Sequence, residues 1–446
     1  MSTSLVLGLG VTGAAVLRAL VAHGEDVLVV DDRPTDAGRR LAAELDVELI
    51  ESPDDATWRA LLARVGSAIP SPGVPDHHPL FRLARPAGVA ILSEFDLAQR
   101  WDHRPLVAIT GTNGKTTVTE LTRAMLDASG LRAAAVGNTE VPLVAAIEDP
   151  ATDVFVVEAS SFRLLHSKHF APDVGTWLNL APDHLDNHAS LGEYISAKAR
   201  LWADQAPSQV AIGNADDPVV AEHLTTAPAR HISFGLTPTA DHHLDGDRLV
   251  LAGGEVLART GDLARAFPHD IANALAAAAG ALHGGGTVDG ARAALLAFRG
   301  LPHRVELVGE SGGVQWYDDS KATAPHATRA AVRGFDSVVL IAGGRNKGLD
   351  LAELAEEVDR IRAVVAIGEA AGEVEQAFDG RRPVRTAGSM GEAVDAAASL
   401  AQPGDVVLLS PACASFDWYR SYAERGDDFT RAVRDLIGAG SAGSGA

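Results

Sequence analysis

The segment 106–119, with the sequence LVAITGTNGKTTVT, constrains the fold of this chain more than any other stretch. Its apolar start predicts a buried strand, and the glycines after it predict a turn into a helix that begins near Lys115. A strand, a glycine turn and a Lys-Thr at a helix start form a cradle for phosphate, because backbone N–H groups there face the anion. Ile109 stands where the longer phosphate loop has its first glycine, so we expect a short variant. The alternative, a chance Gly-Lys-Thr in a surface turn, is disfavoured by the flanking strand and helix.

Length and charge limit the classes of protein that fit. The chain has 446 residues, more than one ordinary core accommodates, so we expect about three domains. A net charge of −21 disfavours nucleic acid and anionic membranes as main partners. Cys413 is the only cysteine, so no intrachain disulfide can form, which fits a reducing compartment. No apolar run approaches the roughly 20 residues of a membrane span. We expect a soluble cytoplasmic monomer without membrane insertion.

Lysine is scarce in this chain. Only five of the 38 basic residues are lysines, at positions 115, 168, 198, 321 and 347. Where a bare positive charge suffices the chain uses arginine, so a retained lysine indicates a need for an amine or a compact charge. Chance retention of one or two is the alternative. Lys198 lies on a predicted amphipathic helix, where its spacing alone indicates a solvated side chain. The scarcity of lysine in the chain instead favours a functional site at this position.

The N-terminus carries a second glycine-rich turn. A strand at 4–10 ends in Gly-x-Gly-x-x-Gly at 8–13, and a second strand at 26–30 ends in Asp31, Asp32 and Arg33. Read alone this βαβ unit indicates NAD, although any nucleoside diphosphate can use the same turn. A tight strand–helix turn without a ligand is the alternative. A Ser-Pro-Gly loop ending in Gly73 follows a further strand, at the sheet edge where ligands bind in open α/β folds.

Other predicted strands also end in polar residues. Glu158 ends a strand at 154–157, which makes it a candidate Mg²⁺ ligand or an ordinary surface acid. His184 follows the strand at 176–180, and it could equally be a satisfied surface histidine. Asn273, one turn into an alanine-rich helix, could bind a base or be a polar residue at a helix start. A third α/β block from about residue 300 has lysine, threonine or serine at three strand ends, which predicts a further ligand cleft.

Together these motifs resemble those of the Mur ligase family over nearly the whole chain. Residues 110–117 are similar to its short phosphate loop, 158–162 to its Glu-x-Ser-Ser-Phe strand end, and 183–186 to its Asp-His-x-Asp loop. Residues 319–323 and 410–417 point to the branch that adds D-glutamate. The resemblance implies three α/β domains: a Rossmann-like UDP-binding domain (1–97), a P-loop ATPase-type ATP-binding domain (98–299) and a Rossmann-like amino-acid-binding domain (300–437). We expect a disordered tail at 438–446.

The resemblance also implies an activity and a set of site residues. The activity is ATP-dependent ligation of D-glutamate to UDP-N-acetylmuramoyl-L-alanine through an acyl phosphate, in peptidoglycan synthesis, with two Mg²⁺ ions and a carbamate on Lys198. The implied catalytic residues are Lys115, Glu158, His184 and Lys198, and the implied metal ligands are Thr116, Glu158, His184 and Lys198. The implied ATP contacts are Gly111, Thr112, Asn113, Gly114, Lys115, Thr116, Thr117, Asn273, Arg304 and Asp319. The implied UDP-substrate contacts are Gly10, Val11, Thr12, Asp31, Asp32, Arg33, Gly73, Asn138 and Ser161. The implied D-glutamate contacts are Lys321, Thr323, Lys347, Ser415 and Tyr422.

The chain departs from the family pattern at three places. Thr139-Glu140 replaces Ile-Gly after Asn138, Asp270 replaces asparagine, and Tyr422 stands where phenylalanine is common.

Four rival functions stay open: a sister ligase for another amino acid, a folylpolyglutamate synthase-like enzyme, a non-catalytic nucleotide sensor, and an NAD oxidoreductase suggested by the N-terminal glycines alone.

Overall fold

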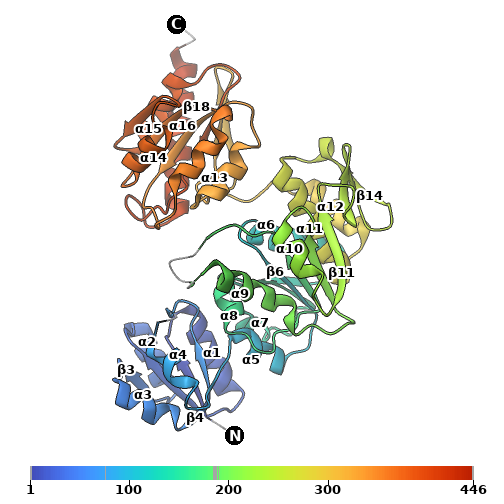
Figure 1. Ribbon diagram of the computed structural model, residues 1–446, viewed down its shortest axis with the longest axis vertical. Helices are drawn as coiled ribbons and strands as arrows, with labels where there is room; N and C mark the ends of the chain where they lie inside the picture. The colour runs from blue at the N-terminus through green and yellow to red at the C-terminus, as the bar shows by residue number, and fades with distance from the viewer. Residues whose placement is uncertain (1–2, 76, 184–187, 189, 444–446) are drawn as a thin grey trace. The chain divides into compact units, whose positions relative to one another are not determined.

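The computed structural model describes residues 3–75, 77–183, 188 and 190–443 (Figure 1). The chain divides into two compact units, Met1–Phe298 and Arg299–Ala446. The first unit contains two sheets and the second contains one. None of the helices in the described ranges is long and apolar enough to cross a membrane.

The N-terminal sheet has five parallel strands in the order β3-β2-β1-β4-β5. Its strands are β1 (Thr3–Leu7), β2 (Val27–Asp31), β3 (Leu49–Glu51), β4 (Val65–Pro70) and β5 (Ala90–Ile91). Its helices are α1 (Val11–Ala22), α2 (Asp36–Glu44), α3 (Asp55–Leu62), α4 (Pro79–Ala84) and α5 (Glu94–Trp101). Four of the five residues of β1 are buried, as its central position requires, because a central parallel strand is covered on both faces. The glycine-rich turn after β1 therefore lies at the carboxyl edge of the sheet.

The central sheet has nine strands in the order β14-β13-β12-β11-β10-β9-β6-β8-β7, in which β13 is antiparallel to both of its neighbours, β12 and β14. Its strands are β6 (Leu106–Thr110), β7 (Ala133–Gly137), β8 (Val154–Glu158), β9 (Val174–Trp177), β10 (Val210–Asn214), β11 (Arg230–Gly235), β12 (His242–Asp245), β13 (Arg248–Val250) and β14 (Val256–Arg259). Its helices are α6 (Lys115–Ala128), α7 (Leu143–Ala146), α8 (Ser161–Leu165), α9 (Leu191–Ala203), α10 (Pro218–Leu224), η1 (Thr260–Asp262), α11 (Pro268–His283) and α12 (Val288–Ala297). Strand β6 pairs with β8 and β9, so three predicted strand ends are neighbours.

One apolar cluster runs through both sheets of the first unit. It includes Val6 of β1, Leu17 of α1, Leu143 of α7 and Phe155 of β8, all less than 2 % exposed. Burial of apolar area at about 25 cal/mol per Å² makes such a shared core costly to open. The Gly-rich turn of the first sheet and the phosphate loop of the second therefore belong to one packed body, as the contact division also indicates.

The second unit holds a six-stranded sheet in the order β15-β16-β20-β17-β18-β19, with β15 antiparallel. Its strands are β15 (Glu306–Ser311), β16 (Val314–Asp318), β17 (Val338–Gly343), β18 (Ile361–Ile367), β19 (Val384–Ala387) and β20 (Val406–Leu409). Its helices are α13 (Pro325–Val332), η2 (Leu351–Arg360), α14 (Ala371–Phe378), α15 (Met390–Leu400) and α16 (Tyr422–Gly443). The three sheets confirm the expected α/β class.

The C-terminal end differs from the expectation. Helix α16 continues through residues 438–443, where we expected a disordered tail. Once a helix is formed, each further residue adds one hydrogen bond at little extra cost, so a small-residue stretch can extend it. The last three residues of the predicted tail lie outside the described residues.

Candidate active site

The phosphate loop has the predicted form. Strand β6 ends at Thr110, and helix α6 begins at Lys115 with Gly114 as its N-cap. Gly114 has φ +83°, and a Cβ there would lie 2.6 Å from Oδ1 of Asn273. Only glycine adopts this left-handed conformation without strain. The same close approach shows that Asn273, the predicted adenine contact, lies beside the loop.

Asn179, which sequence reasoning did not select, binds this loop. Its Oδ1 accepts hydrogen bonds from the backbone N–H groups of Thr112 and Asn113, at 3.1 and 2.8 Å. Its Nδ2 donates to the carbonyl oxygen of Asn113 at 3.1 Å. Asn179 follows β9, the strand next to β6. Its place after a predicted strand, among the other polar strand ends, was the available signal.

Two of the scarce lysines meet at one carbonyl. Lys115 Nζ donates to the oxygens of Gly111 and Thr112, at 2.9 and 3.0 Å, and Lys198 Nζ donates to the same Gly111 oxygen at 2.7 Å. Lys198 is 1 % exposed and lies over the ring of Tyr194. Burial lowers the pKa of Lys198 well below its usual value, the neighbouring Lys115 lowers it further, and Asp183 opposes the shift. Lys198 is therefore a buried amine at the phosphate loop, and not the solvated lysine that helical spacing alone indicated.

Glu158 lies at the end of β8 and is 4 % exposed. Its Oε1 accepts a hydrogen bond from Nδ2 of Asn138 at 3.0 Å. Its Oε2 is buried and has no hydrogen-bond partner among the residues that the structure describes. A buried carboxylate oxygen without a partner is costly, and a metal ion is one way to satisfy it.

The remaining predicted residues of the central sheet are placed in part. His184 lies outside the described residues. Ser161, at the start of α8, has its Oγ 3.0 Å from Nε2 of His188, and that histidine stacks on Phe162. Thr116 and Thr117 occupy the first turn of α6, directly after Lys115. The structure thus brings the phosphate loop, Glu158, Asn138, Asn273 and Lys198 to one edge of the central sheet.

In the N-terminal sheet, two predicted UDP contacts are already engaged within the protein. Asp31 accepts hydrogen bonds from the backbone N–H of Leu9 at 2.7 Å and of Arg33 at 2.9 Å. Asp31 therefore shapes the glycine-rich turn directly. Oδ2 of Asp32 lies 3.0 Å from Nε2 of His78, a buried residue that the sequence did not single out.

The other predicted UDP contacts lie around the same edge. Gly10 is the N-cap of α1, Val11 is 70 % exposed, and a Cβ at Gly73 would meet no atom within 4 Å. The hydroxyl of Thr12 instead accepts a hydrogen bond from Arg163 of α8. Open space and an exposed apolar side chain beside the turn leave room for a ligand.

The second unit gathers its predicted residues at the ends of β16, β17 and β20. Lys321 Nζ lies 3.8 Å from the ring centroid of Tyr422, and Lys347 Nζ lies 3.5 Å from Oγ1 of Thr323. Ser415, 2 % exposed, follows β20. Asp319 accepts a hydrogen bond from Ser410 at 2.7 Å, and burial raises the pKa of its carboxyl to about 7.

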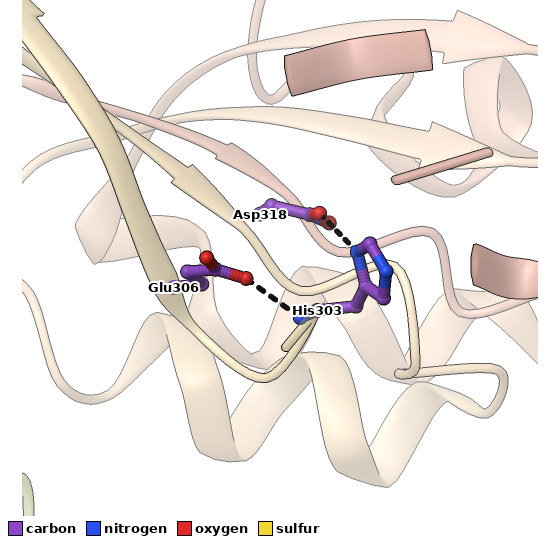
Figure 2. A group of neighbouring side chains, drawn as sticks. All are labelled: His303, Glu306 and Asp318. Atoms are coloured by element: carbon purple, nitrogen blue, oxygen red, sulfur yellow. Dashed lines mark hydrogen bonds and ion pairs between the residues drawn. The ribbon is translucent and has the colours of Figure 1, made fainter. Parts of the chain in front are cut away.

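Arg304 lies in a strained turn. His303 and Val305 on either side have φ of +59° and +51°, which is costly for a β-branched residue such as Val305. Figure 2 shows what holds the turn: Nδ1 of His303 lies 2.6 Å from Oδ2 of Asp318, and the His303 N–H donates to Glu306 at 3.0 Å. The Asp318 carboxylate raises the pKa of His303. The possible ligand atoms of His303, Glu306 and Asp318 lie within 4.8 Å of one another, but Nδ1 of His303 is already paired with Asp318.

Arg425 is a second residue that sequence reasoning missed. It is 1 % exposed, and its guanidinium donates to Oγ and the carbonyl oxygen of Ser320 and to the carbonyl oxygen of Cys413. It thereby fixes the segments after β16 and β20 against each other. Burial raises the pKa of the Cys413 thiol to about 12, so this cysteine is an inert core residue.

Two departures from the family pattern have local compensation. Asp270 accepts two hydrogen bonds from the guanidinium of Arg265, at 2.7 and 2.8 Å, so its charge is paired. The Thr139 hydroxyl and the Val141 backbone hydrogen-bond to each other within a turn, and Glu140 points into solvent. Neither change places an unpaired buried charge beside the phosphate loop.

Comparison with known proteins gives the family. Three family models match: the Mur ligase MurD-like N-terminal domain at residues 2–93, the Mur ligase middle domain at 109–281 and the Mur ligase glutamate ligase domain at 303–413. A UDP-N-acetylmuramoylalanine–D-glutamate ligase of Frankia casuarinae is 44 % identical, covering 96 % of this chain and 93 % of its own. The chain belongs to the Mur ligase family. A ligase of the same name from Geobacter metallireducens is 39 % identical to this Mur ligase, with 97 % of both chains covered.

Solved structures agree with the fold of this Mur ligase. MurF from Acinetobacter baumannii superposes with a TM-score of 0.61 at 19 % identity, covering 96 % of this chain and 90 % of that chain. The UDP-N-acetylmuramate–alanine ligase MurC from Thermotoga maritima superposes with a TM-score of 0.58 at 18 % identity, covering 98 % and 100 %. At this identity the likeness concerns the three-domain α/β fold alone.

Proposed function

We propose that this Mur ligase uses ATP to join D-glutamate to UDP-N-acetylmuramoyl-L-alanine, in the cytoplasm, as a step of peptidoglycan precursor synthesis. The observation that carries the proposal is the 44 % identity, over 96 % of this chain, to a ligase of that name. The residues at the strand ends supply a physical account of it. We assign the UDP end of the substrate to residues 1–97, ATP to 98–299 and D-glutamate to 300–437, in a protein that acts as a monomer.

The reaction has to activate a carboxylate before an amine can attack it. The alanyl carboxylate takes the γ-phosphoryl group of ATP, which gives an acyl phosphate and ADP; the amine of D-glutamate then attacks, and phosphate leaves. The loop of Gly111–Thr117 offers N–H groups at the start of α6, and Lys115 would exchange its two carbonyl partners for phosphate oxygens. Because the protein does little covalent chemistry here, positioning supplies most of the rate.

The residues at the loop fit a divalent cation. Glu158 has a buried carboxylate oxygen without a partner among the described residues, and the Thr116 hydroxyl lies in the first turn of α6. Mg²⁺ prefers such oxygen ligands, and it would offset the charge on the phosphate oxygens. We assign one ion to Thr116 and Glu158 and a second to His184 and Lys198.

Lys198 suits the second role as a carbamate. A carbamate forms when an uncharged amine takes up CO₂ and releases a proton, and it presents carboxylate oxygens in place of an ammonium. The lowered pKa of Lys198 favours the uncharged amine. Arginine cannot undergo this reaction, which agrees with the retention of lysine at this position in an arginine-rich chain.

The third assignment concerns the amino acid. D-glutamate carries two carboxylates, and the second unit presents two lysines: Lys321 follows β16 and Lys347 follows β17, the two strands on either side of β20. Thr323 lies beside Lys347, Tyr422 lies beside Lys321, and Ser415 follows β20. Charge-assisted hydrogen bonds to both carboxylates would select an acidic amino acid over alanine. Arg304 and Asp319 of the same unit are assigned to the nucleotide.

Phosphate release with a panel of amino acids tests the proposal. The purified protein is given ATP, Mg²⁺ and UDP-N-acetylmuramoyl-L-alanine, and phosphate is measured with D-glutamate, L-alanine or diaminopimelate, and separately with folate plus glutamate. Release that depends on both the UDP-substrate and D-glutamate is expected. Equal release with another amino acid would favour a sister ligase, and ATP binding without release would favour a nucleotide sensor.

A further inference from the structure

A buried ion pair joins the two sheets of the first unit, outside the residues assigned to the site. Arg163 on α8 and Glu94 at the start of α5 are 6 % and 3 % exposed. Nη1 of Arg163 pairs with Oε1 of Glu94, and Oε2 of Glu94 accepts a hydrogen bond from the Val144 N–H at 2.9 Å. The Glu94 carboxylate therefore connects α5, which follows the N-terminal sheet, to α7 and α8 of the central sheet.

The second terminal nitrogen of the guanidinium reaches the glycine-rich turn. Nη2 of Arg163 donates to Oγ1 of Thr12 at 3.0 Å. Arg163 itself lies five residues after Glu158, in the segment that leaves the end of β8. One rigid, planar group thus contacts the turn assigned to the UDP end of the substrate and belongs to the segment that follows the Glu158 strand end. A lysine lacks the fork of donors that makes both contacts at once.

Stability alone is a weak reason to keep such a pair. Two charges removed from water gain little net energy from each other, and apolar residues of similar volume are often as stable. Burial raises the pKa of the Glu94 carboxyl, while Arg163 opposes that shift. Nε of Arg163 is buried without a hydrogen-bond partner within the described part of the chain. Burying this ion pair therefore costs folding free energy, which fits a requirement that the segments it joins keep a fixed geometry.

We propose that Arg163 is a positioning residue for ligation, which holds the Thr12 turn at a fixed distance from the Glu158 strand end by binding Glu94 and Thr12 together. The inference rests on the proposed function, because the substrate carboxylate must approach the γ-phosphorus to about 3–3.5 Å before it reacts. A misplacement of about 1 Å costs on the order of 100-fold in rate. We call the contacts of Arg163 with Glu94 and Thr12 the tether. When the tether is lost, substrate and ATP can each still bind, but the carboxylate and the γ-phosphorus are held at the wrong distance.

The test is a double variant, Glu94→Met with Arg163→Met. It leaves no unpaired buried charge, so it avoids the main reason for which a single replacement would unfold the protein. We expect kcat to fall at least tenfold while the KM values for ATP and D-glutamate stay within twofold. Arg163→Lys, which keeps the charge but not the fork, is expected to show the same split. The matched control is Arg132→Met with Asp153→Met, an exposed ion pair of the same unit, and it should leave kcat unchanged.

Hydrogen–deuterium exchange supplies a readout that does not depend on turnover. Amides of residues 9–13 should exchange faster in the Glu94/Arg163 double variant than in the parent or the control. If the parent itself makes no product from D-glutamate, the proposed function fails, and the exchange result still tests the tether. A kcat within twofold of the parent, or unchanged exchange at residues 9–13, would overturn the inference.

Discussion

Replacing Lys198 with methionine should stabilise the protein while it abolishes ligation. Lys198 is 1 % exposed, and burial lowers its pKa. An ammonium that leaves water costs several kcal/mol even after the surroundings relax. Methionine is apolar, unbranched and adaptable, so it can fill the same space without that cost. The variant therefore separates the effect of the buried amine on stability from its role in ligation.

The magnitude follows from the contacts of Lys198. The main loss is its hydrogen bond to the Gly111 carbonyl oxygen, about 0.5–1.5 kcal/mol for an uncharged donor. The acceptor is not left unpaired, because Lys115 also donates to it at 2.9 Å. Set against the cost of burial, the net gain is about 1–3 kcal/mol. With about 2.1 cal/mol/K of unfolding entropy per residue over the unit Met1–Phe298, this raises Tm by roughly 2–5 °C.

The pH dependence has a definite sign. The pKa of Lys198 is lower in the folded protein than in the unfolded chain, so between the two values the unfolded state binds more protons, and the stability of the parent rises with pH. The stability advantage of Lys198→Met is therefore largest at low pH and disappears as pH rises past the unfolded value near 10.4.

Differential scanning calorimetry at pH 7 and pH 10, in bicarbonate-free buffer, measures this effect beside phosphate-release kinetics. Lys168→Met, at an exposed lysine, is the control and should change neither Tm nor turnover. A Tm of Lys198→Met below that of the parent would refute the reasoning about the buried amine. Wild-type-like turnover in Lys198→Arg would refute the carbamate, whereas partial rescue of Lys198→Ala by bicarbonate or a small carboxylate would support it.

Three further variants test other parts of the account. Gly114→Ala should lose most ATP-dependent turnover and about 1–2 kcal/mol of stability, because the φ of Gly114 is +83° and the new Cβ would lie 2.6 Å from Asn273 Oδ1. Calorimetry and kinetics measure both effects. The control is Gly391→Ala on α15, where a Cβ meets no atom within 4 Å. Asn179→Ala removes the acceptor of two loop N–H groups and should change the KM for ATP at least fivefold, with the KM for D-glutamate within twofold in steady-state kinetics. An unchanged KM for ATP would show that the loop keeps its form without this side chain. The pKa of Asp319 is raised to about 7, so its contribution to stability is complete below about pH 4 and is lost as pH rises to 7. Urea unfolding should show the parent losing about 2–3 kcal/mol more than Asp319→Asn between pH 5 and pH 8, and parallel pH profiles would contradict the shift.

Much of the fold was predictable because parallel strands carry local signals. The apolar runs at β6 and β8, each ended by a polar residue, predicted both strands and the sheet edge at which Lys115 and Glu158 both lie. The three-domain α/β class was confirmed by the sheets and the family models. The scarcity of lysine predicted that Lys198 belongs to a functional site, and the structure shows that its side chain is buried.

The residues that sequence reasoning missed act through contacts between distant segments. Asn179 binds a loop 66 residues earlier in the chain, Arg163 binds Thr12 151 residues earlier, and Arg425 binds Ser320 105 residues earlier. Their local sequence carries no periodicity or motif that reveals the partner. Asp31 had the expected position, but its carboxylate binds backbone N–H groups of its own sheet edge, which only the folded turn defines. The assigned roles of the site residues stay predictions until the variants are measured.

Isotope transfer from the substrate carboxylate tests the central claim most directly. UDP-N-acetylmuramoyl-L-alanine labelled with ¹⁸O in both carboxylate oxygens is incubated with the protein, ATP, Mg²⁺ and D-glutamate, and mass spectrometry measures the products. An acyl-phosphate route predicts ADP, an amide product heavier by one glutamate less one water, and phosphate that carries one ¹⁸O atom. Unlabelled phosphate, AMP with pyrophosphate, or no amide with D-glutamate would contradict the account.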